Sequence, residues 1–546
     1  MQKILSNRLF IGFLLFFGCV NLFLNNGFIS LWDQDEAAYA GFASVMRSTG
    51  NWVIPDFLWS DIHRKTPLHF WLIALSYGIF GENEFALRFP SALAVLLTWV
   101  STFYLGRSVF GKERALLATL LVVASIFLVN LGKIAVTDAL LTFFETVAVL
   151  ALLNFLVHYR WYYNLLFWAA VSAGMLVKGP PILIVSAGTG GLLLLFHSSR
   201  WRLLMLHPWF FFPLALLPLW LWGRAAWLAD NGVFITWLYD WYIAKRASGE
   251  TVLGQWGPPG YFLLVFMLSF LPFTVFFPAA LREIVRQIRG KLHNEQYLLL
   301  ICWLAGGWWI YEIIPSKLPS YSLGAYAAVA FLLADIMLRI ETEDFGTLRI
   351  GKGLFLFFSS LIALGLVIGS VLLLDTWGIA VASFTALVWS VLAGFSYRAY
   401  HQKNWEAGFR WGSLQVLVFV FLAWLLIIPS FEEPRGATKR IAEKIAQTSP
   451  NTVEVVFARP FYLPSLPFYV LQSGRKYRGL EEQEFEQVFG LYAQKKPTVI
   501  VFDKEKCDLF VARLDSQKQK MPRVEIIRGW VSDMGKLIEY KLVYNF

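Results

Sequence analysis

Residues 8–40 read RLFIGFLLFFGCVNLFLNNGFISLWDQDEAAYA, an apolar stretch followed at once by an acidic run. The stretch 8–29 has the length that a membrane-crossing helix needs, about 20 mainly apolar residues. Carboxylates so close to a membrane are costly unless they face water, a metal or a substrate. The acidic run, which holds Asp33, Asp35 and Glu36, therefore predicts a chemical role beside the membrane.

The composition of the 546-residue chain is typical of a membrane protein. Hydrophobic residues make up 57% of it, charged residues only 15%, and the mean hydropathy is +0.56, which does not describe a soluble globule. The net charge of +10 is spread over short loops, which argues against nucleic-acid binding. Cys19, Cys302 and Cys507 are far apart and indicate neither a disulfide framework nor a thiolate metal site.

Apolar stretches along the chain predict about thirteen membrane-spanning helices. They lie near residues 8–29, 86–107, 114–131, 138–158, 162–177, 180–197, 203–222, 260–280, 296–313, 321–339, 351–373, 376–397 and 408–428. Lys and Arg gather in alternate loops, which predicts that those loops are cytoplasmic. The acidic run then lies on the opposite, periplasmic face, and an odd number of spans places the C-terminal tail there too.

The chain is expected to form two domains, a transmembrane domain at 1–430 and a small soluble periplasmic α/β domain at 431–546. The evidence for the second is an alternation of strand-like and helix-like runs. The strand-like runs are 453–458, 497–502 and 536–544, and the helix-like runs are 439–447 and 481–495. In the first outer loop, residues 36–47 and 67–80 predict two further helices, which would hold carboxylates at the membrane interface.

Seven motifs then follow in a recognisable order. They are DQDEAAYA at 33–40, NWVIPDF at 51–57, KTPLHFW at 65–71, FGENEFALRFPSALA at 80–94, TDALL at 137–141, LVKGP at 176–180 and SKLPSY at 316–321. This order resembles the bacterial protein mannosyltransferase-like glycosyltransferases, and within them the lipid A aminoarabinose transferases. The resemblance covers residues 30 to about 330.

That resemblance implies a polytopic α-helical GT-C fold in the bacterial inner membrane. It also implies a polyprenyl-phosphate sugar donor and transfer at the periplasmic face. The acceptor would be a molecule of the lipid A or lipopolysaccharide type, or another envelope glycan. An alternative is an enzyme like the protein O-mannosyltransferases, with a Ser or Thr acceptor.

Such a donor leaves a phosphomonoester behind when its sugar is transferred. The growing negative charge needs fixed cations, a metal or preorganised donors. The candidate donor-phosphate-binding residues are Lys65, Lys178, Arg246 and Lys317.

The acceptor attacks the anomeric carbon from the opposite face. If it is a hydroxyl, a carboxylate must take its proton, and Asp35 is the candidate base, with Glu36 and Asp138 as supporting catalytic groups. If it is a phosphate, no strong base is needed, and the carboxylates would orient an amino sugar or a cation. Tyr39 and Tyr321 are the candidate substrate-binding residues.

These residues also have purely structural interpretations. The acids of the run would cap a helix at its positive end, and Asp138 would be the N-cap of the fourth span. Lys65 and Lys178 would anchor helix ends at the interface, and Tyr321 would be a tyrosine of the aromatic belt. The resemblance and the cost of surplus charge near lipid favour the functional interpretation.

The chain departs from the aminoarabinose transferases at their metal ligands. The resemblance implies a Glu where this chain has Arg64, and a His where it offers Tyr242, Ile243 or Ala244. Zinc coordination of that kind is therefore not expected, although Asp35, Glu36 and His63 together could hold a divalent cation. The departures leave the sugar open among galacturonic acid, mannose, glucose and other hexoses.

A transporter or lipid flippase is the alternative from another functional class. Transporters tend to have internal repeats and polar residues near the bilayer midplane. Here the unusual polar residues gather at the outer ends of the predicted spans, which favours an enzyme.

Overall fold

The computed structural model describes residues 1–245, 255–290, 293–343, 345–458, 463–494, 496–517, 521–531 and 536–546. The chain forms two compact units. Unit 1 comprises Met1–Leu24, Lys65–Leu72 and Arg88–Ile427, and unit 2 comprises Asn25–Arg64, Ile73–Leu87 and Ile428–Phe546. The helices α4 (Leu68–Phe80) and α5 (Glu84–Phe110) each contribute to both units.

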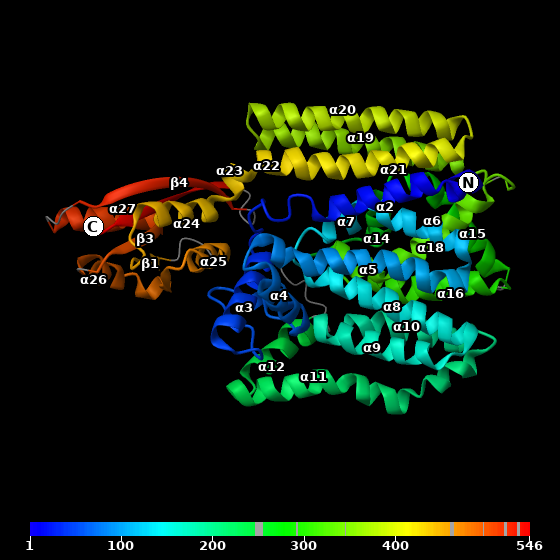
Figure 1. Ribbon diagram of the computed structural model, residues 1–546, viewed down its shortest axis with the longest axis horizontal. Helices are drawn as coiled ribbons and strands as arrows, with labels where there is room; N and C mark the ends of the chain where they lie inside the picture. Colours follow the sequence, from blue (N-terminus) through cyan, green and yellow to red (C-terminus); the bar gives the residue numbers. More distant parts are fainter. Residues whose placement is uncertain are drawn as a thin grey trace. The chain divides into compact units, whose positions relative to one another are not determined.

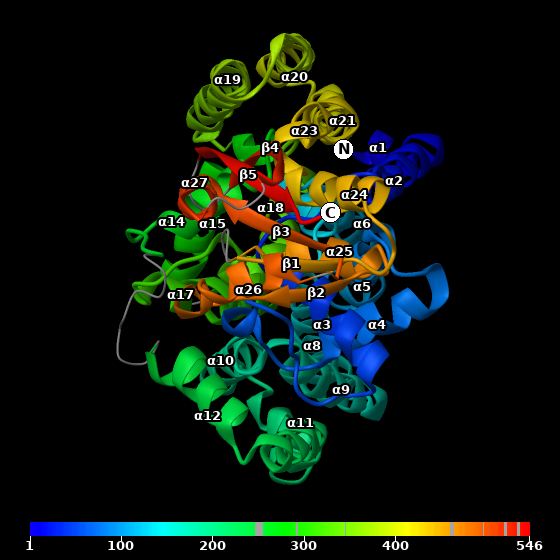
Figure 2. The same ribbon diagram turned by 90° about the vertical axis from the view of Figure 1, so that its left-hand side faces the viewer.

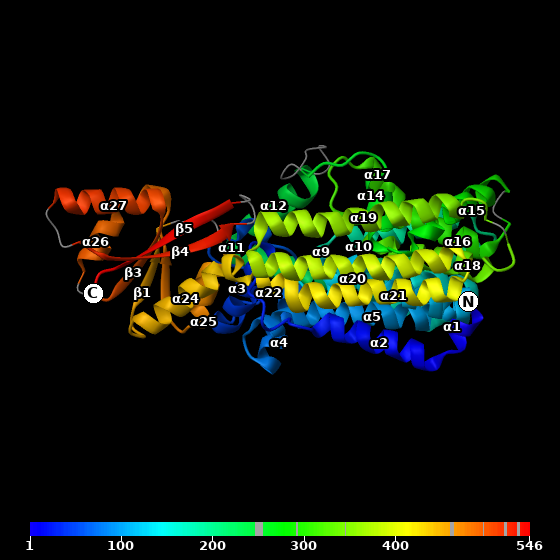
Figure 3. The ribbon, with the colours of Figure 1, turned by 90° about the horizontal axis from the view of Figure 1, so that it is seen from above.

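Unit 1 is helical throughout the part that the structure describes. Its elements are α1 (Gln2–Ser6), α2 (Arg8–Phe23), α6 (Lys112–Val123), α7 (Ile126–Leu131), α8 (Thr137–His158), α9 (Trp161–Lys178), α10 (Pro181–Phe196), η2 (Arg200–Leu206), α11 (Pro208–Asp230), α12 (Val233–Tyr239), η3 (Asp240–Ala244), α14 (Tyr261–Ser269), η5 (Phe273–Phe276), α15 (Phe277–Arg289), α16 (Glu295–Leu304), η6 (Ala305–Trp309), α17 (Ile310–Ile313), η7 (Pro319–Ala325), α18 (Tyr326–Arg339), α19 (Leu348–Leu373), α20 (Thr376–His401), α21 (Trp405–Leu422) and η8 (Ala423–Ile427). Helix α8 packs on α9 (Figure 1), and α20 packs between α19 and α21 (Figure 3).

Local chemistry sets the ends of several of these helices. The Asp375 side chain accepts a hydrogen bond from the Gly378 N–H at 2.8 Å and so caps the start of α20, and Asn404 caps α21 in the same way. Helix α9 ends at Gly179, whose φ of 77° suits glycine. The predicted span 260–280 is broken after Ser269, because Pro272 follows and cannot continue a helix.

Seven of the described helical segments are long and apolar enough to cross a membrane. They are Glu84–Phe110, Thr137–His158, Pro208–Asp230, Pro319–Arg339, Leu348–Leu373, Thr376–His401 and Trp405–Ser430. Shorter apolar helices are Arg8–Phe23, Leu68–Phe80 and Pro181–Phe196. The predicted class, a polytopic helical membrane protein, is confirmed, while the count of thirteen spans stays a prediction.

Unit 2 contains a five-stranded mixed sheet. Its elements are α3 (Asp35–Thr49), η1 (Asp61–His63), α22 (Ile428–Ser430), α23 (Glu432–Arg435), α24 (Ala437–Thr448), β1 (Glu454–Phe457), α25 (Ser465–Gln472), β2 (Lys476–Gly479), η9 (Glu482–Glu484), α26 (Gln487–Ala493), β3 (Thr498–Asp503), α27 (Lys504–Ser516), β4 (Arg523–Val531) and β5 (Lys536–Tyr544). The strand order is β2-β1-β3-β5-β4, with the first three parallel and β5 antiparallel to both of its neighbours (Figure 2).

Alternate residues of the sheet face two helical layers, as the pleat of a strand requires. Val456, Ile500 and Phe502 point to the side of α26 and α27 and share a core with Phe510 and Leu514. Helices α24 and α25 cover the other side (Figure 3). The three predicted strands are present, but the predicted helix 481–495 is a 3₁₀ turn followed by the short α26.

Segments from the first outer loop are part of unit 2. Arg435 donates hydrogen bonds to the Ser30 and Leu31 carbonyls. The Lys439 ammonium lies 2.6 Å from the Glu84 carboxylate, which also accepts from the Tyr469 hydroxyl at 3.2 Å. Contacts far apart in the sequence thus hold the acidic run against the C-terminal segment.

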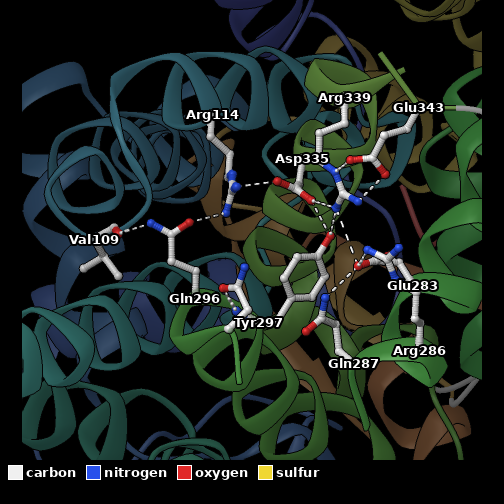
Figure 4. Close-up of polar contacts among 11 residues, drawn as sticks. Val109, Arg114, Glu283, Arg286, Gln287, Gln296, Tyr297, Asp335, Arg339 and Glu343 are labelled. Carbon is white, nitrogen blue, oxygen red and sulfur yellow. Dashed lines mark hydrogen bonds and ion pairs between the residues drawn. The ribbon is translucent and has the colours of Figure 1, made fainter. Parts of the chain in front are cut away.

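A buried ion network joins three helices of unit 1 (Figure 4). Asp335 of α18 pairs with Arg114 of α6 and accepts from the Tyr297 hydroxyl of α16. Arg339, one turn further along α18, lies 3.0 Å from the same carboxylate and 3.0 Å from the Tyr297 hydroxyl. Arg114 and Arg339 therefore bind the helices of this network together.

We expect Asp335→Asn to destabilise unit 1, because Asp335 is 3% exposed and two guanidinium groups would lose their counter-charge. Loss of one partner of a buried ion pair costs about 3–5 kcal/mol. Glu343→Gln is the matched control, since Glu343 pairs with Arg339 but is 41% exposed, and an exposed pair contributes under about 1 kcal/mol. Thermal unfolding of the detergent-solubilised protein measures both, and equal unfolding temperatures for the two variants would contradict the role of the network.

Candidate active site

An ion pair between two helix ends lies at the centre of the candidate site in unit 1. Asp138 is the second residue of α8, and Lys178 is the last residue of α9. The Lys178 ammonium lies 2.7 Å from the Asp138 carboxylate, and each side chain is 15% exposed. Each charge also suits the dipole of its own helix end. The sequence interpretation of Asp138 as an N-cap is not what the structure has, because Val136 holds that position.

One cavity beside this pair is lined with hydroxyl groups and acids, and we call it the hydroxyl-lined cavity. It has a volume of about 290 Å³, and its walls include Asp138, Glu145, Lys178, Ser316 and Tyr321. Asp138 and Glu145 are seven residues apart on α8 and so share one face. The hydroxyls of Ser316 and Tyr321 are buried without a hydrogen-bond partner among the described residues, which leaves them available to a polar ligand.

A second cavity, which we call the apolar cavity, adjoins the first. It has a volume of about 370 Å³, and Leu219, Trp222 and Ile235 contribute to its walls together with Lys65. Lys178, Pro180 and Tyr242 line both cavities. Lys65 is close enough to Asp138 for its charge to act on that carboxylate. The two cavities therefore place lysine ammonium groups beside an apolar space and beside a space whose walls also carry acids and hydroxyl groups.

The acidic run lies in unit 2, where its three carboxylates have different partners. Asp33 accepts hydrogen bonds from the Ser465 N–H at 2.9 Å and from its hydroxyl at 2.5 Å. Glu36 is buried and accepts from the Trp32 N–H at 2.9 Å. Asp35 is half exposed and lies 2.8 Å from Nδ1 of His63.

Tyr39 acts on Asp35 from the next turn of α3. Its ring is fully buried, and its hydroxyl donates to the Asp35 carboxylate at 3.2 Å. A side chain in this position orients Asp35. Asp35, Tyr39 and His63 therefore form one group, whereas the described contact of Glu36 is to the backbone of the segment that precedes its helix.

Lys317 does not line either cavity. Its ammonium donates to the carbonyls of Glu312 at 2.8 Å and of Ile314 at 3.0 Å, and its side chain is 2% exposed. It holds the end of α17, while Ser316, Ser320 and Tyr321 of the same SKLPSY motif line the hydroxyl-lined cavity. Arg246 lies outside the residues that the structure describes. The donor-phosphate roles of Lys317 and Arg246 stay predictions.

Sequence reasoning did not single out Glu145, Ser316 or Ser320. The signal for Glu145 was present, because it is an acid inside the long apolar run 139–157, and an ionisable residue at that depth indicates function. Gly324 gives it room, since a Cβ there would lie 2.7 Å from the Glu145 carboxylate. Ser316 and Ser320 belong to the SKLPSY motif, in which only Lys317 and Tyr321 were predicted to be site residues.

The metal site that the family resemblance implies does not fit the residues present. Arg64 occupies the position of the expected Glu and lies 2.8 Å from both Asp56 and Asp61. Among the described residues, no group of three or more His, Cys, Asp or Glu side chains is placed to hold a metal ion.

The helical unit and the small sheet match the GT-C glycosyltransferase fold. Solved structures establish this fold: ArnT from Cupriavidus metallidurans, bound to undecaprenyl phosphate, matches with a TM-score of 0.76 at 18% identity and covers 100% of this chain and 98% of that one. The apo state of the same protein matches with a TM-score of 0.75. The predicted GT-C fold is confirmed.

Sequence comparison narrows the class. Residues 64–222 match the family described as dolichyl-phosphate-mannose-protein mannosyltransferase. The chain is 26% identical over 366 residues to the undecaprenyl phosphate-alpha-4-amino-4-deoxy-L-arabinose arabinosyl transferase of Edwardsiella ictaluri, and covers 62% of its length. The enzyme of the same name from Pseudomonas paraeruginosa is 28% identical, with 60% of its length covered. An uncharacterized protein of Aquifex aeolicus is 26% identical, with 84% covered. The resemblance to the aminoarabinose transferases is confirmed.

Proposed function

We propose that this chain is an integral-membrane glycosyltransferase that moves a sugar from a polyprenyl-phosphate donor to an acceptor of the bacterial envelope. The observation that carries the proposal is the pair of cavities that share Lys178. Such a donor has three parts, which are an apolar chain, a phosphate and a sugar. The apolar cavity offers apolar walls for the chain, and the lysine ammonium groups suit the phosphate. The unpaired hydroxyls of the hydroxyl-lined cavity suit the sugar.

The lysines suit the charge that develops during transfer. When the bond from the anomeric carbon to the phosphate oxygen breaks, its electron pair stays on the phosphate. Lys65 and Lys178 line the apolar cavity and would stabilise that charge. Asp138 holds the Lys178 ammonium at 2.7 Å, so the cation is fixed before the donor arrives and costs no reorganisation.

The hydroxyl-lined cavity suits a sugar. Carboxyl oxygens accept hydrogen bonds, and hydroxyls donate as well as accept. Asp138, Glu145, Ser316 and Tyr321 therefore supply partners for several sugar hydroxyls. The cavity does not distinguish a pentose from a hexose by these groups alone, and either sugar is compatible with the proposal.

The names of the relatives support a polyprenyl-phosphate donor, but they do not agree on the sugar. The aminoarabinose transferases use undecaprenyl phosphate, and the matched family is named for dolichyl-phosphate-mannose. Both donors are a sugar on a polyprenyl phosphate. The departures at Arg64 and Tyr242 leave this chain without the metal ligands of the aminoarabinose transferases, so the proposal does not extend to aminoarabinose.

We expect Lys178→Met to weaken the binding of undecaprenyl phosphate to the full-length protein in nanodiscs. Hydrogen bonds to charged groups contribute about 1.5–3 kcal/mol, so the dissociation constant should rise roughly 10- to 100-fold. Lys178→Arg keeps the charge and should retain most of the affinity. Lys112→Met, an exposed lysine on α6, is the matched control and should bind as the wild type does. Unchanged binding by Lys178→Met would contradict the proposal.

We also propose that residues 431–546 lie in the periplasm and that the membrane is the inner one. The orientation is tested with a variant of the protein that lacks its native cysteines. A single cysteine then replaces either Ser516 or Gln402, both of which are exposed. An impermeant maleimide should label position 516 and not position 402 once the outer membrane is permeabilised. Of the native thiols, Cys507 is buried, which raises its pKa to about 11 and lowers its reactivity. Labelling of position 402 alone would reverse the proposed topology.

A further inference from the structure

One buried acid of unit 1 has no partner within the described part of the chain. Glu145 of α8 is 3% exposed, and no described residue donates a hydrogen bond to its carboxyl group or pairs with it. A buried polar group without a partner costs free energy, and an acid inside a long apolar helix is costly in a membrane. This cost indicates that the partner of Glu145 is a ligand.

The Glu145 side chain belongs to the wall of the hydroxyl-lined cavity. Asp138, another wall residue, lies seven residues earlier on the same face of α8. Seven residues of helix span roughly 10 Å, so the two acids occupy separate positions along the wall. Gly324 packs against the Glu145 carboxyl group, where a larger residue would collide with it. The fold therefore keeps a place for this acid in the cavity wall.

The proposed function determines which part of a donor would meet Glu145. It assigns the donor phosphate to Lys65 and Lys178, and Lys178 lines both cavities. Asp138 binds Lys178 at 2.7 Å and so marks the phosphate end of the hydroxyl-lined cavity. Glu145 lies farther along α8 than this pair. A sugar in the cavity would therefore present to Glu145 the substituents farthest from its anomeric carbon.

The charges around the cavity favour an uncharged partner for Glu145. Lys178 is a cation whose charge reaches Glu145, but its ammonium is already bound to Asp138. A uronic acid would add a carboxylate beside two acids whose neighbouring cation is already paired, and a buried charge needs a partner. An ammonium group would require an ionised Glu145, whereas a carboxyl group in either protonation state forms a hydrogen bond with a hydroxyl.

The rest of the cavity wall suits a neutral sugar ring. The hydroxyls of Ser316 and Tyr321 are buried without a partner among the described residues. The rings of Tyr311 and Tyr321 lie 5.9 Å apart, and both residues line the cavity. Leu141 and Ile184 add apolar surface. Aromatic and apolar faces beside hydroxyl groups match the two kinds of surface on a neutral sugar.

We infer that Glu145 is a specificity-determining residue that binds a hydroxyl of the donor sugar at the end far from the phosphate, so that the donor carries a neutral sugar. The inference rests on the proposed function and names its donor class. It concerns recognition alone, because no bond forms or breaks at Glu145 and its carboxyl group takes no proton in the transfer.

The test measures the binding of undecaprenyl phosphate and its sugar derivatives to the full-length protein in nanodiscs. Two matched pairs of sugars differ only at the end far from the phosphate. Galactose is compared with galacturonic acid, and L-arabinose with 4-amino-4-deoxy-L-arabinose. We expect the neutral member of each pair to bind more tightly than the charged one.

Glu145→Leu should raise the Kd of the neutral derivatives roughly 3- to 10-fold, because one hydrogen bond is lost. The Kd of undecaprenyl phosphate itself should change less than about twofold. Glu145→Gln keeps a hydrogen-bonding group without the charge and should bind the neutral derivatives nearly as the wild type does. Thr146→Val is the matched control, since Thr146 is buried on α8 and is not among the described residues that line either cavity.

Thermal unfolding of the unliganded proteins separates recognition from a structural role. Glu145→Leu should unfold at the wild-type temperature or above it, because no described contact within the protein is lost. Three results would overturn the inference: unchanged binding of neutral sugars by Glu145→Leu, equal losses in the Leu and Gln variants, or tighter binding of a charged sugar by the wild type. A clear fall in the unfolding temperature of Glu145→Leu would do the same. Failure of the wild type to bind undecaprenyl phosphate would instead overturn the proposed function.

Discussion

The ion pair between Asp138 and Lys178 is the constraint on which the candidate site of unit 1 depends. Charges that leave water must be paired, because an unpaired buried charge costs several kcal/mol. The pair joins the start of α8 to the end of α9 at 2.7 Å, where both helix dipoles favour it. Lys178 then forms part of the wall of both cavities. One electrostatic requirement thus fixes the helix ends and places a cation where the two cavities meet.

In unit 2 the three acids of the run have separate roles because the fold gives them separate partners. The carboxylate of Asp33 binds Ser465 at the start of α25, and that of Glu36 accepts the Trp32 N–H. Only Asp35 is half exposed and bound to a histidine. The two neighbours hold the loop and the helix start in place, and this leaves Asp35 oriented toward His63. Asp33 and Glu36 therefore have structural contacts, while the chemical role of Asp35 stays a prediction.

The sequence predicted the fold class well, because its evidence is physical and local. Long apolar runs identify membrane helices without knowledge of their packing, and the strand-like run at 497–502 identifies a central strand. The motifs also predicted Asp138, Lys178, Lys65 and Tyr321, which the structure places around two adjoining cavities. The sequence could not show where each side chain of a motif points. Lys317 and Tyr321 share a motif, and Tyr321 lines a cavity, yet the Lys317 ammonium binds the carbonyls at the end of α17. The contact between Asp33 and Ser465 spans 432 positions, and no local pattern encodes it.

The cavities of unit 1 and a groove of unit 2 differ in charge, and so in whether they favour or repel a phosphate group. In unit 1 the lysines favour a phosphate, and the carboxylate of Asp138 neutralises only part of their charge. In unit 2 the groove beside residues 56–63 has an acidic described lining, which would repel a phosphate group. A transferase that releases a phosphomonoester must retain the donor phosphate during reaction and must keep its acceptor from competing for the same cations.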